Sequence, residues 1–252
     1  MSGHSKWSTI KRKKAAMDAK RGKLFTKLGR ELAIAAREGG PDPEANFKLR
    51  LVIEKAKAAN MPKDNIERAI RRGAGLEKGE ALEEVTYEGY GPHGVALLVH
   101  VVTDNRNRAV SEVRRTFSRH GGNLGEAGCV AWLFESKGYL TVEPNDHAPE
   151  QLFEAAVEAG AEDVVISDDL VEIYTDPSNF HQVRDALIAA GITPDSAQLS
   201  MIPKSLMSLG VKETTQVMGL IDALEELDDV QEVYSNLEIS DEVLLQYEQE
   251  KA

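Results

Sequence analysis

The residues best suited to chemistry in this sequence are the cations at its start. The first thirty residues hold ten lysines and arginines against a single carboxylate, that of Asp18. This density of positive charge, on a chain whose net charge is −12, exceeds what solubility requires and indicates a surface for a polyanion, with nucleic-acid phosphate as the leading candidate. The predicted contact residues in this stretch are Lys6, Trp7, Lys11, Arg12, Lys13, Lys14, Lys20, Arg21, Lys23 and Lys27.

Positive charge continues on a helix that is predicted further along the chain. Taken alone, the run Lys11–Lys14 would be a solvated tail. The later helix extends the same sign, with Arg68, Arg71 and Arg72 preceded by Lys63. This continuation favours contact with phosphate over a merely solvated tail.

Other residues near the start have roles that depend on this interpretation. Lys20, Arg21 and Lys23 would position a nucleic-acid backbone without reading its bases. Trp7 has two alternatives, which the sequence leaves open. Its ring would stack on an exposed base, a contact worth ~1–3 kcal/mol, or it would fold the tail onto the helices that follow.

A second candidate surface is a stripe of arginines on the helix predicted from Arg108 to His120. At about 100° per residue, Arg115 and Arg119 fall within roughly 20° of Arg108. The stripe leads into a glycine-rich loop, whose backbone amides can approach a phosphate or a protein partner closely. A solvated helix face also accounts for the arginines, and Glu126 disfavours phosphate beside the loop, so both alternatives stay open. The candidate residues of the loop are Gly121, Gly122 and Asn123.

No group of residues has the spacing of an active site. The six histidines are scattered and form no metal-ligand pair. Cys129 lies in a predicted apolar strand, where a packed thiol is expected. The pairs Asp168-Asp169 and Asp228-Asp229 fall at predicted turns, where solvated carboxylates are expected. Neither a P-loop nor a dinucleotide fingerprint is present. The sequence therefore predicts a non-enzymatic protein without metal or cofactor.

Charge and composition narrow the class of protein. Residues 1–75 carry a formal charge of +11, and the remainder carries −23. This division indicates a basic binding module joined to acidic domains, which would repel nucleic acid and are suited to protein partners. A single cysteine fits a reducing compartment. No apolar run reaches the ~20 residues of a membrane span, and the basic start lacks the apolar core of a secretory signal. We expect a cytoplasmic protein that does not bind membranes.

Three helices are predicted to position the first group of cations. The first runs from about Asp18 to the glycines at 39 and 40, with an apolar face of Leu24, Phe25, Leu28, Leu32 and Ala35. The second is expected to start with Asp42 as its cap and Pro43 at its first position. The third follows a break at Asn60-Met61-Pro62 and ends at Gly73. Together they predict a small bundle with a basic exterior.

The rest of the chain changes to strand periodicity. Strands are predicted at 85–90, 95–102 and 129–134, with the arginine helix between the second and third. Residues 139–202 then read as a complete βαββαβ unit, with strands at 139–142, 164–166, 170–174 and 197–202 and helices from Pro149 and Phe180. The helix predicted at 217–227 and the strand predicted at 230–234 supply the second helix and fourth strand that the middle domain otherwise lacks.

The predicted fold class is therefore α+β or α/β. It consists of an N-terminal three-helix bundle and two ferredoxin-like α/β domains, the last inserted into the middle one. The expected boundaries are 1–79 for the basic tail and bundle, 80–135 with 205–252 for the discontinuous domain, and 136–204 for the inserted domain. The inserted domain lacks aromatic pairs on its predicted strands, so it does not resemble an RNA-recognition sheet.

Several separated motifs resemble one family over nearly the whole chain. They are GHSKW at 3–7, DAKRGKLFTK at 18–27, YEGYGP at 87–92, DNRNR at 104–108, GGNLG at 121–125, AEDV at 161–164, SMIP at 200–203 and DDVQEVY at 228–234. In this order they resemble the YebC family of bacterial proteins, which has a mitochondrial relative that activates translation of a cytochrome oxidase subunit. The resemblance implies the same three-domain arrangement.

The resemblance implies a regulator of gene expression, in one of two forms. Family members are usually described as transcriptional regulators that bind DNA, and others resemble translation factors that act on ribosomal RNA at proline-rich stalls. The flexible basic tail and the absence of an evident helix-turn-helix favour RNA or the ribosome slightly. A hypothesis of another class is a protein–protein adaptor whose basic arm binds an acidic partner. A hydrolase is the remaining alternative.

Overall fold

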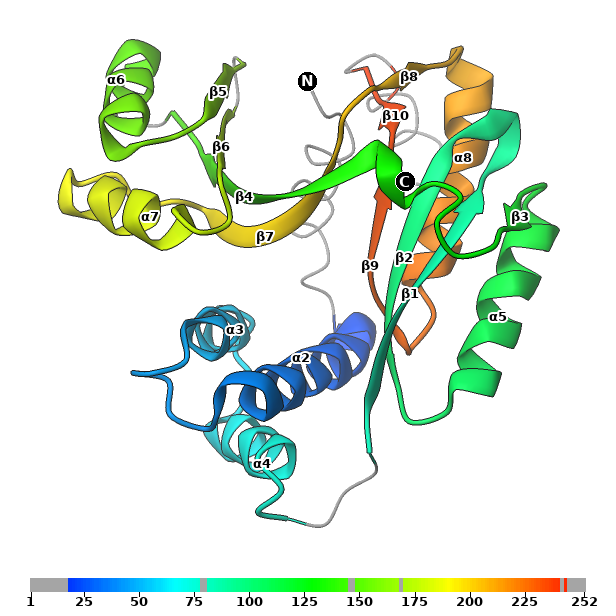
Figure 1. The fold of residues 1–252 in the computed structure, drawn as a ribbon, viewed down its shortest axis with the longest axis horizontal. Helices are drawn as coiled ribbons and strands as arrows, with labels where there is room; N and C mark the ends of the chain where they lie inside the picture. Colours follow the sequence, from blue (N-terminus) through cyan, green and yellow to red (C-terminus); the bar gives the residue numbers. More distant parts are fainter. Residues whose placement is uncertain (1–17, 78–80, 145–147, 168–169, 241–242, 244–252) are drawn as a thin grey trace. The chain divides into compact units, whose positions relative to one another are not determined.

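The structure is a computed structural model that describes residues 18–77, 81–144, 148–167, 170–240 and 243. The chain forms an α+β fold (Figure 1), as expected from the sequence. It divides into two compact units. Unit 1 is Phe134–Lys204, and unit 2 combines Ser2–Leu133 with Ser205–Ala252. The finer division into three domains stays a prediction.

Three helices make the first part of unit 2. They are α2 (Asp18–Gly39), α3 (Phe47–Ala58) and α4 (Lys63–Gly73). Their apolar faces meet in one core, because each repeats buried residues every three or four positions. That core contains Leu28, Leu32, Leu49, Val52, Ile66 and Ala69. The break before α4 and its end at Gly73 agree with the sequence analysis.

The second helix starts later than predicted. Its N-cap is Asn46, whose side-chain oxygen accepts a hydrogen bond from the Leu49 amide at 3.0 Å, whereas Asp42 and Pro43 lie in a preceding turn. The Asn46 amide also donates to the carbonyls of Ala35 at 2.7 Å and Gly40 at 2.8 Å. A buried asparagine with three partners thus ties the end of α2 to the start of α3. The prediction of Asp42 as the cap was wrong because Asp42 and Asn46 are both residue types that cap helices, and the sequence does not distinguish between them.

The rest of unit 2 is a four-stranded antiparallel sheet with the order β3-β1-β2-β9. Its strands are β1 (Glu83–Tyr90), β2 (Ala96–Thr103), β3 (Asn123–Leu124) and β9 (Val230–Ser235). The helices are α5 (Arg106–Arg119) and α8 (Val211–Glu225), with short 3₁₀ turns η1 (Pro92–Gly94) and η2 (Ala131–Leu133). A parallel pair, β8 (Met207–Ser208) and β10 (Leu237–Glu238), completes it.

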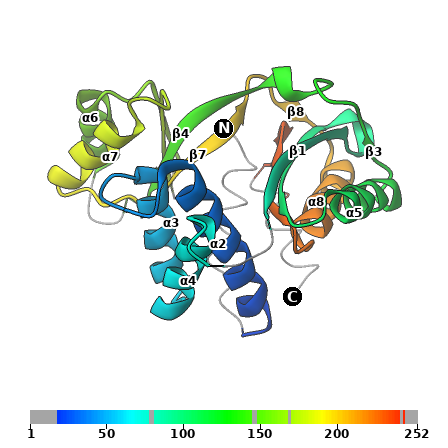
Figure 2. The same ribbon diagram turned by 60° about the horizontal axis from the view of Figure 1, so that its bottom comes forward.

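The helices α5 and α8 lie side by side against this sheet (Figure 2). Phe117 of α5 and Leu220 and Leu224 of α8 share a core with Leu97 and Val99 of β2. The tail of the chain therefore completes the sheet begun near residue 83, since β9 pairs with β2 and α8 packs in the same core. The apolar run at 95–102, which was predicted to be a strand, is the central strand β2.

The strand predicted at 129–134 is wrong. Residues 125–130 form turns, η2 follows, and the next strand begins only at Phe134. Cys129 is therefore a half-buried residue of a turn rather than part of a strand. Burial and the neighbouring Glu88 carboxylate raise the pKa of its thiol, which disfavours the thiolate.

Unit 1 is a βαββαβ unit with the strand order β5-β6-β4-β7. Its strands are β4 (Phe134–Val142), β5 (Asp163–Ile166), β6 (Val171–Thr175) and β7 (Ser196–Pro203). Its helices are α6 (Pro149–Ala159) and α7 (Phe180–Ala189), which contact each other. This is the ferredoxin-like order. Phe153 and Val157 are exposed apolar residues of α6, and Asp168-Asp169 lies outside the described residues.

Candidate nucleic-acid interface

Part of the predicted interface lies outside the described residues. This holds for Lys6, Trp7, Lys11, Arg12, Lys13 and Lys14. Lys20 lies in the first turn of α2, outside the residues whose side chains are described. For these positions, contact with phosphate stays a prediction.

The described cations of α2 face the end of α8 within unit 2. Lys23 donates to the carbonyl of Glu226 at 3.0 Å and to its carboxylate at 3.2 Å. Lys27 donates to the carbonyl of Glu225 at 2.6 Å. These carbonyls belong to the last turn of a helix, where cations are stabilised by the unsatisfied backbone and its dipole. The guanidinium of Arg21 lies 5.8 Å from the ring centroid of Phe25.

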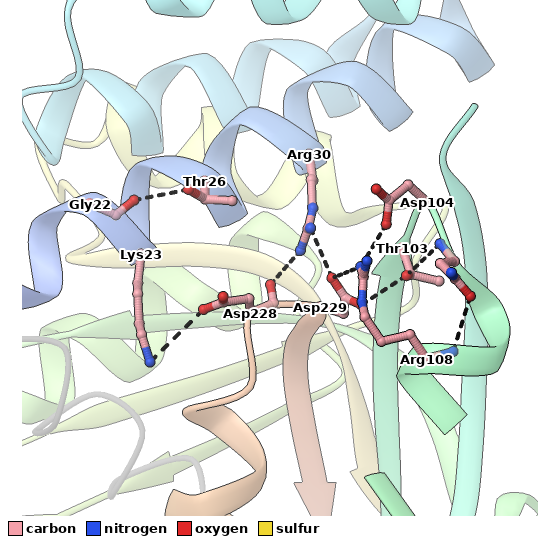
Figure 3. Close-up of polar contacts among 10 residues, drawn as sticks. Gly22, Lys23, Thr26, Arg30, Thr103, Asp104, Arg108, Asp228 and Asp229 are labelled. Atoms are coloured by element: carbon pink, nitrogen blue, oxygen red, sulfur yellow. Dashed lines mark hydrogen bonds and ion pairs between the residues drawn. The ribbon is translucent and has the colours of Figure 1, made fainter. Parts of the chain in front are cut away.

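The buried carboxylate of Asp229 forms ion pairs with two arginines. Arg30 of α2 and Arg108 of α5 each place a guanidinium nitrogen 2.8 Å from one of its oxygens, and Thr103 donates to it at 2.8 Å (Figure 3). The Asp229 side chain is 4% exposed. The prediction of a solvated turn acid is therefore wrong for Asp229, although Asp228 beside it is 68% exposed.

Arg108 is consequently paired with carboxylates of the protein itself, although its side chain is 43% exposed. Its guanidinium also donates to Asp104 at 2.6 Å, and the hydrogen bonds that it donates to Asp229 and Asp104 raise its pKa further above the usual range. Arg30 donates in addition to the carbonyl of Asp228. In the stripe predicted on α5, Arg108 thus joins α5 to α2 and the start of β9 through Asp229, whereas Arg115 and Arg119 do not.

The remaining predicted arginines are exposed. Arg68 and Arg72 of α4, and Arg115 and Arg119 of α5, have no ion-pair partner in the part of the chain that the structure describes. Arg71, between the first two, pairs with Glu77 at 2.8 Å. Among the predicted contact residues that the structure describes, exposed arginines without an ion-pair partner therefore lie at the end of α4 and at the end of α5.

The glycines of the predicted loop have structural reasons of their own. Gly121 follows α5 with a φ of +74°, a conformation that L side chains disfavour. A Cβ on Gly122 would lie 2.7 Å from the carbonyl oxygen of Tyr90, so the close approach to β1 requires glycine. Asn123 is exposed and pairs with Tyr90 in the sheet. Among the three loop candidates, Asn123 is the one whose side chain can contact a ligand.

Two exposed aromatic residues were missed by the sequence analysis. Tyr90 is 39% exposed and Trp132 is 65% exposed. Their polar ends share one anchor, because the Tyr90 hydroxyl and the Trp132 indole both donate to the carbonyl of Cys129, at 3.0 Å and 3.1 Å. The wrong strand prediction at 129–134 explains why Trp132 was missed, since it was interpreted as an ordinary residue of that strand.

The turn that carries Trp132 is fixed by Glu88. This buried carboxylate accepts backbone hydrogen bonds from Gly128 at 2.6 Å, Val130 at 2.8 Å and Ala131 at 2.7 Å. Burial by itself would raise the pKa of Glu88, but the three amides outweigh it and hold the pKa below its usual value. No sequence signal marks such a cradle, because its donors are backbone groups.

Comparison with known proteins identifies the family. A family model described as the TACO1/YebC protein N-terminal domain matches residues 5–76, and one described as the TACO1/YebC second and third domain matches residues 82–237. The chain belongs to the TACO1/YebC family. The resemblance inferred from the motifs is thereby confirmed.

Relatives of this TACO1/YebC chain match it over nearly their full length. A protein of Trichlorobacter lovleyi is 57% identical over 95% of this chain and 97% of its own, and one of Rubrobacter xylanophilus is 59% identical over 97% and 98%. Both are named probable transcriptional regulatory protein. A crystal structure of a conserved hypothetical protein from Aquifex aeolicus has 51% identity and a TM-score of 0.83, covering 90% of this chain and 94% of the other.

The described part of this TACO1/YebC protein also limits other classes of site. Within the described ranges, no helix is long and apolar enough to span a membrane. Among the same residues, no three histidine, cysteine, aspartate or glutamate side chains gather as metal ligands would.

The Asp229 network makes a sharp prediction about stability. Asp229→Asn is expected to lower the free energy of unfolding of this family member by about 3 kcal/mol, because it leaves two guanidiniums beside a neutral amide. The adjacent Asp228→Asn removes the same charge from an exposed site and should change the unfolding free energy by less than about 0.5 kcal/mol. Urea denaturation followed by circular dichroism measures both. Equal effects would show that the network does not stabilise the fold.

A second prediction concerns pH. Because folding lowers the pKa of Glu88, its carboxylate stabilises the protein above the ordinary value of 4.5, and this contribution is lost as the pH falls through the lower folded value. Glu88→Gln should therefore be less stable than the unmodified protein near neutral pH, and the gap should narrow as the pH falls below the ordinary value of 4.5. Denaturation across this range tests it, with the exposed Glu126→Gln as control. A gap that stays constant with pH would contradict the assignment.

Proposed function

We propose that this chain is a non-enzymatic, cytoplasmic regulator of gene expression that binds nucleic acid through exposed arginines of unit 2. Membership of the TACO1/YebC family supports the regulatory role, since its relatives are named probable transcriptional regulatory proteins. Nucleic acid is the proposed partner because phosphate is the ligand that clustered, uncompensated arginines bind best.

The observation that carries the proposal is the unequal treatment of cations within unit 2. Lys23, Arg30 and Arg108 are paired with Glu226, Asp228 or Asp229. Arg68 and Arg72 on α4 are left exposed instead, in a chain with an excess of acidic residues. The chain as a whole has 42 aspartates and glutamates against 30 lysines and arginines, so the surplus of positive charge is local to residues 1–75, which contain α4. Charge left uncompensated in this context supports a site for an external anion.

The basic segment before α2 extends the same proposal. Lys6 and Lys11–Lys14, together with Lys20 in the first turn of α2, would add phosphate contacts to those of α4, and Trp7 follows Lys6 in the sequence. Arg21 is exposed and lies at the same end of the chain. Contacts of this kind follow the backbone and give affinity without sequence recognition.

Salt dependence of binding tests the proposal. The double variant Arg68→Gln with Arg72→Gln should weaken binding to DNA and RNA, and should reduce the slope of log affinity against log salt by about 1.8 for duplex DNA or about 1.4 for single strands. Fluorescence anisotropy with labelled oligonucleotides of both kinds measures it.

The matched control removes two positive charges that already have partners. Lys48 and Lys55 of α3 pair with Glu38 and Glu31, so Lys48→Gln with Lys55→Gln alters the net charge equally without removing a cation of α4. Equal losses in both double variants would reduce the effect to overall charge and contradict a site on α4. Binding to an acidic protein, with none to DNA or RNA, would support the adaptor alternative instead.

A second candidate function is action on RNA at the ribosome, which the exposed aromatic pair favours. Trp132 presents its ring from the turn that the Glu88 carboxylate holds, and Tyr90, at the end of β1, shares the Cys129 carbonyl with it. Asn123 lies opposite Tyr90 in the sheet. Anchored aromatic rings stack on unpaired bases, which single-stranded RNA offers and duplex DNA does not. An asparagine beside them can bind a base edge.

Trp132 fluorescence distinguishes the two candidates. In a Trp7→Phe background, stacking should quench Trp132 emission when a single-stranded oligonucleotide binds and leave it unchanged with a duplex. Trp132→Ala should weaken single-strand binding by about 5- to 150-fold, the equivalent of one stacked base, whereas Trp132→Phe keeps a stacking face and should retain most of the affinity. Quenching by duplex DNA alone would favour the transcriptional role.

A further inference from the structure

A shallow cavity of about 570 Å³, wide open to solvent, lies in unit 2 where η1, the end of α5 and the middle of α8 meet. It is separate from the α4 arginines and from the aromatic pair. Its lining includes Pro92, His93, Arg119, His120, Gln216 and Gly219. The volume falls within the ~300–1,000 Å³ of sites for small molecules.

The first unusual feature of this cavity is a glycine inside a helix. Gly219 is the ninth residue of the fifteen-residue helix α8, where glycine is less favourable than alanine. Nothing lies within 4 Å of the position that a Cβ would occupy there, so packing does not require glycine. The missing side chain instead leaves bare helix backbone as part of the cavity wall. A flat group can lie against such a surface.

The second feature is a histidine in a disfavoured backbone conformation. His93 has a φ of +62°, in the left-handed region that few residues other than glycine adopt. Its Nε2 lies 2.8 Å from Oε1 of Gln216, so the ring is tied across the cavity to α8. This hydrogen bond fixes the Gln216 amide, whose NH₂ group is a donor suited to an acceptor on a ligand.

The third feature is the pair of nitrogen donors at the end of α5. Arg119 has no ion-pair partner among the described residues. His120 donates from Nδ1 to the carbonyl of Thr116 at 2.9 Å, so its Nε2 donates to a phosphate oxygen when the ring is an imidazolium. A guanidinium beside an imidazole is a suitable pair of ligands for a phosphate group.

We infer that this cavity binds a nucleoside phosphate. The phosphate contacts Arg119 and His120, the base lies flat against the backbone at Gly219 beside Pro92, and the Gln216 amide binds the base edge. This nucleotide is either free in solution or a terminal nucleotide of a strand. The inference goes beyond the proposed function, because it requires neither the α4 arginines nor the aromatic pair.

Calorimetric titration with the four ribonucleoside 5′-monophosphates, a 5′-phosphorylated tetranucleotide, inorganic phosphate and the nucleosides tests the site. At least one monophosphate should bind saturably and more tightly than inorganic phosphate or its own nucleoside, since both parts of the ligand contribute. Tighter binding of the tetranucleotide than of every monophosphate identifies a strand terminus as the source, and the reverse order identifies a free nucleotide. Absence of saturable binding by all of them, or equal affinity for inorganic phosphate, would overturn the inference.

Variants then connect binding to the cavity. Arg119→Gln should weaken binding by about 10- to 100-fold, the loss expected for a hydrogen bond to a charged group. Gly219→Leu should abolish it by filling the wall, and Gly219→Ala should weaken it while raising the melting temperature by a few degrees.

Gly22→Ala in α2 is the matched control, because it makes the same substitution in a helix at an equally open position outside the cavity. It should leave nucleotide affinity unchanged. Normal affinity in both Arg119→Gln and Gly219→Leu would overturn the inference. Measuring the α4 double variant in parallel separates the two proposals, since it should bind mononucleotides normally.

Discussion

One carboxylate sets the arrangement of unit 2. Asp229, at the start of β9, holds Arg30 of the helical bundle and Arg108 of α5 while it accepts a hydrogen bond from Thr103 of β2. A buried charge is costly unless it is paired and hydrogen-bonded, and here all three partners come from different elements. The four segments can satisfy Asp229 only in one relative arrangement. The bundle and the sheet are therefore coupled by electrostatics as well as by chain connectivity.

The same network explains how a protein so rich in acid can carry basic surfaces. Carboxylates at the end of α8 and the start of β9 pair with Lys23 and Arg30 of α2. The carbonyl of Glu225 accepts a hydrogen bond from Lys27. Cations on α4 and at the end of α5 lie outside the reach of this network. The net positive charge of the chain is thereby confined to residues 1–75, whereas the remainder has a negative excess. Binding in this molecule follows from which charges the fold leaves uncompensated.

Local periodicity was enough to predict most elements, because one buried face per helix or strand leaves a regular trace. The central strand β2 and the βαββαβ order of unit 1 could be predicted in this way. Features that depend on partners distant in sequence could not. Asn46 rather than Asp42 caps α3 because its amide also finds two carbonyls of the α2 end. Asp229 looked like a solvated acid because both of its arginines lie more than one hundred residues away.

The candidate site shows the same limit. Exposed arginines could be predicted from helical spacing, but the sequence does not reveal which of them an internal carboxylate neutralises, and Arg108 was counted with Arg115 for that reason. A backbone cradle such as that of Glu88 has no residue signature at all.

The pairing of β4 with β7 has a consequence for the history of the chain. Phe134, where the polypeptide enters unit 1, is the direct partner of Pro203, where it leaves. Antiparallel partners are about 5 Å apart at their Cα atoms, so the two crossing points are no farther apart than the ends of a tight hairpin. A short turn could join them in an ancestor without unit 1, and a segment of this length could be acquired or lost there while the flanking core stayed intact.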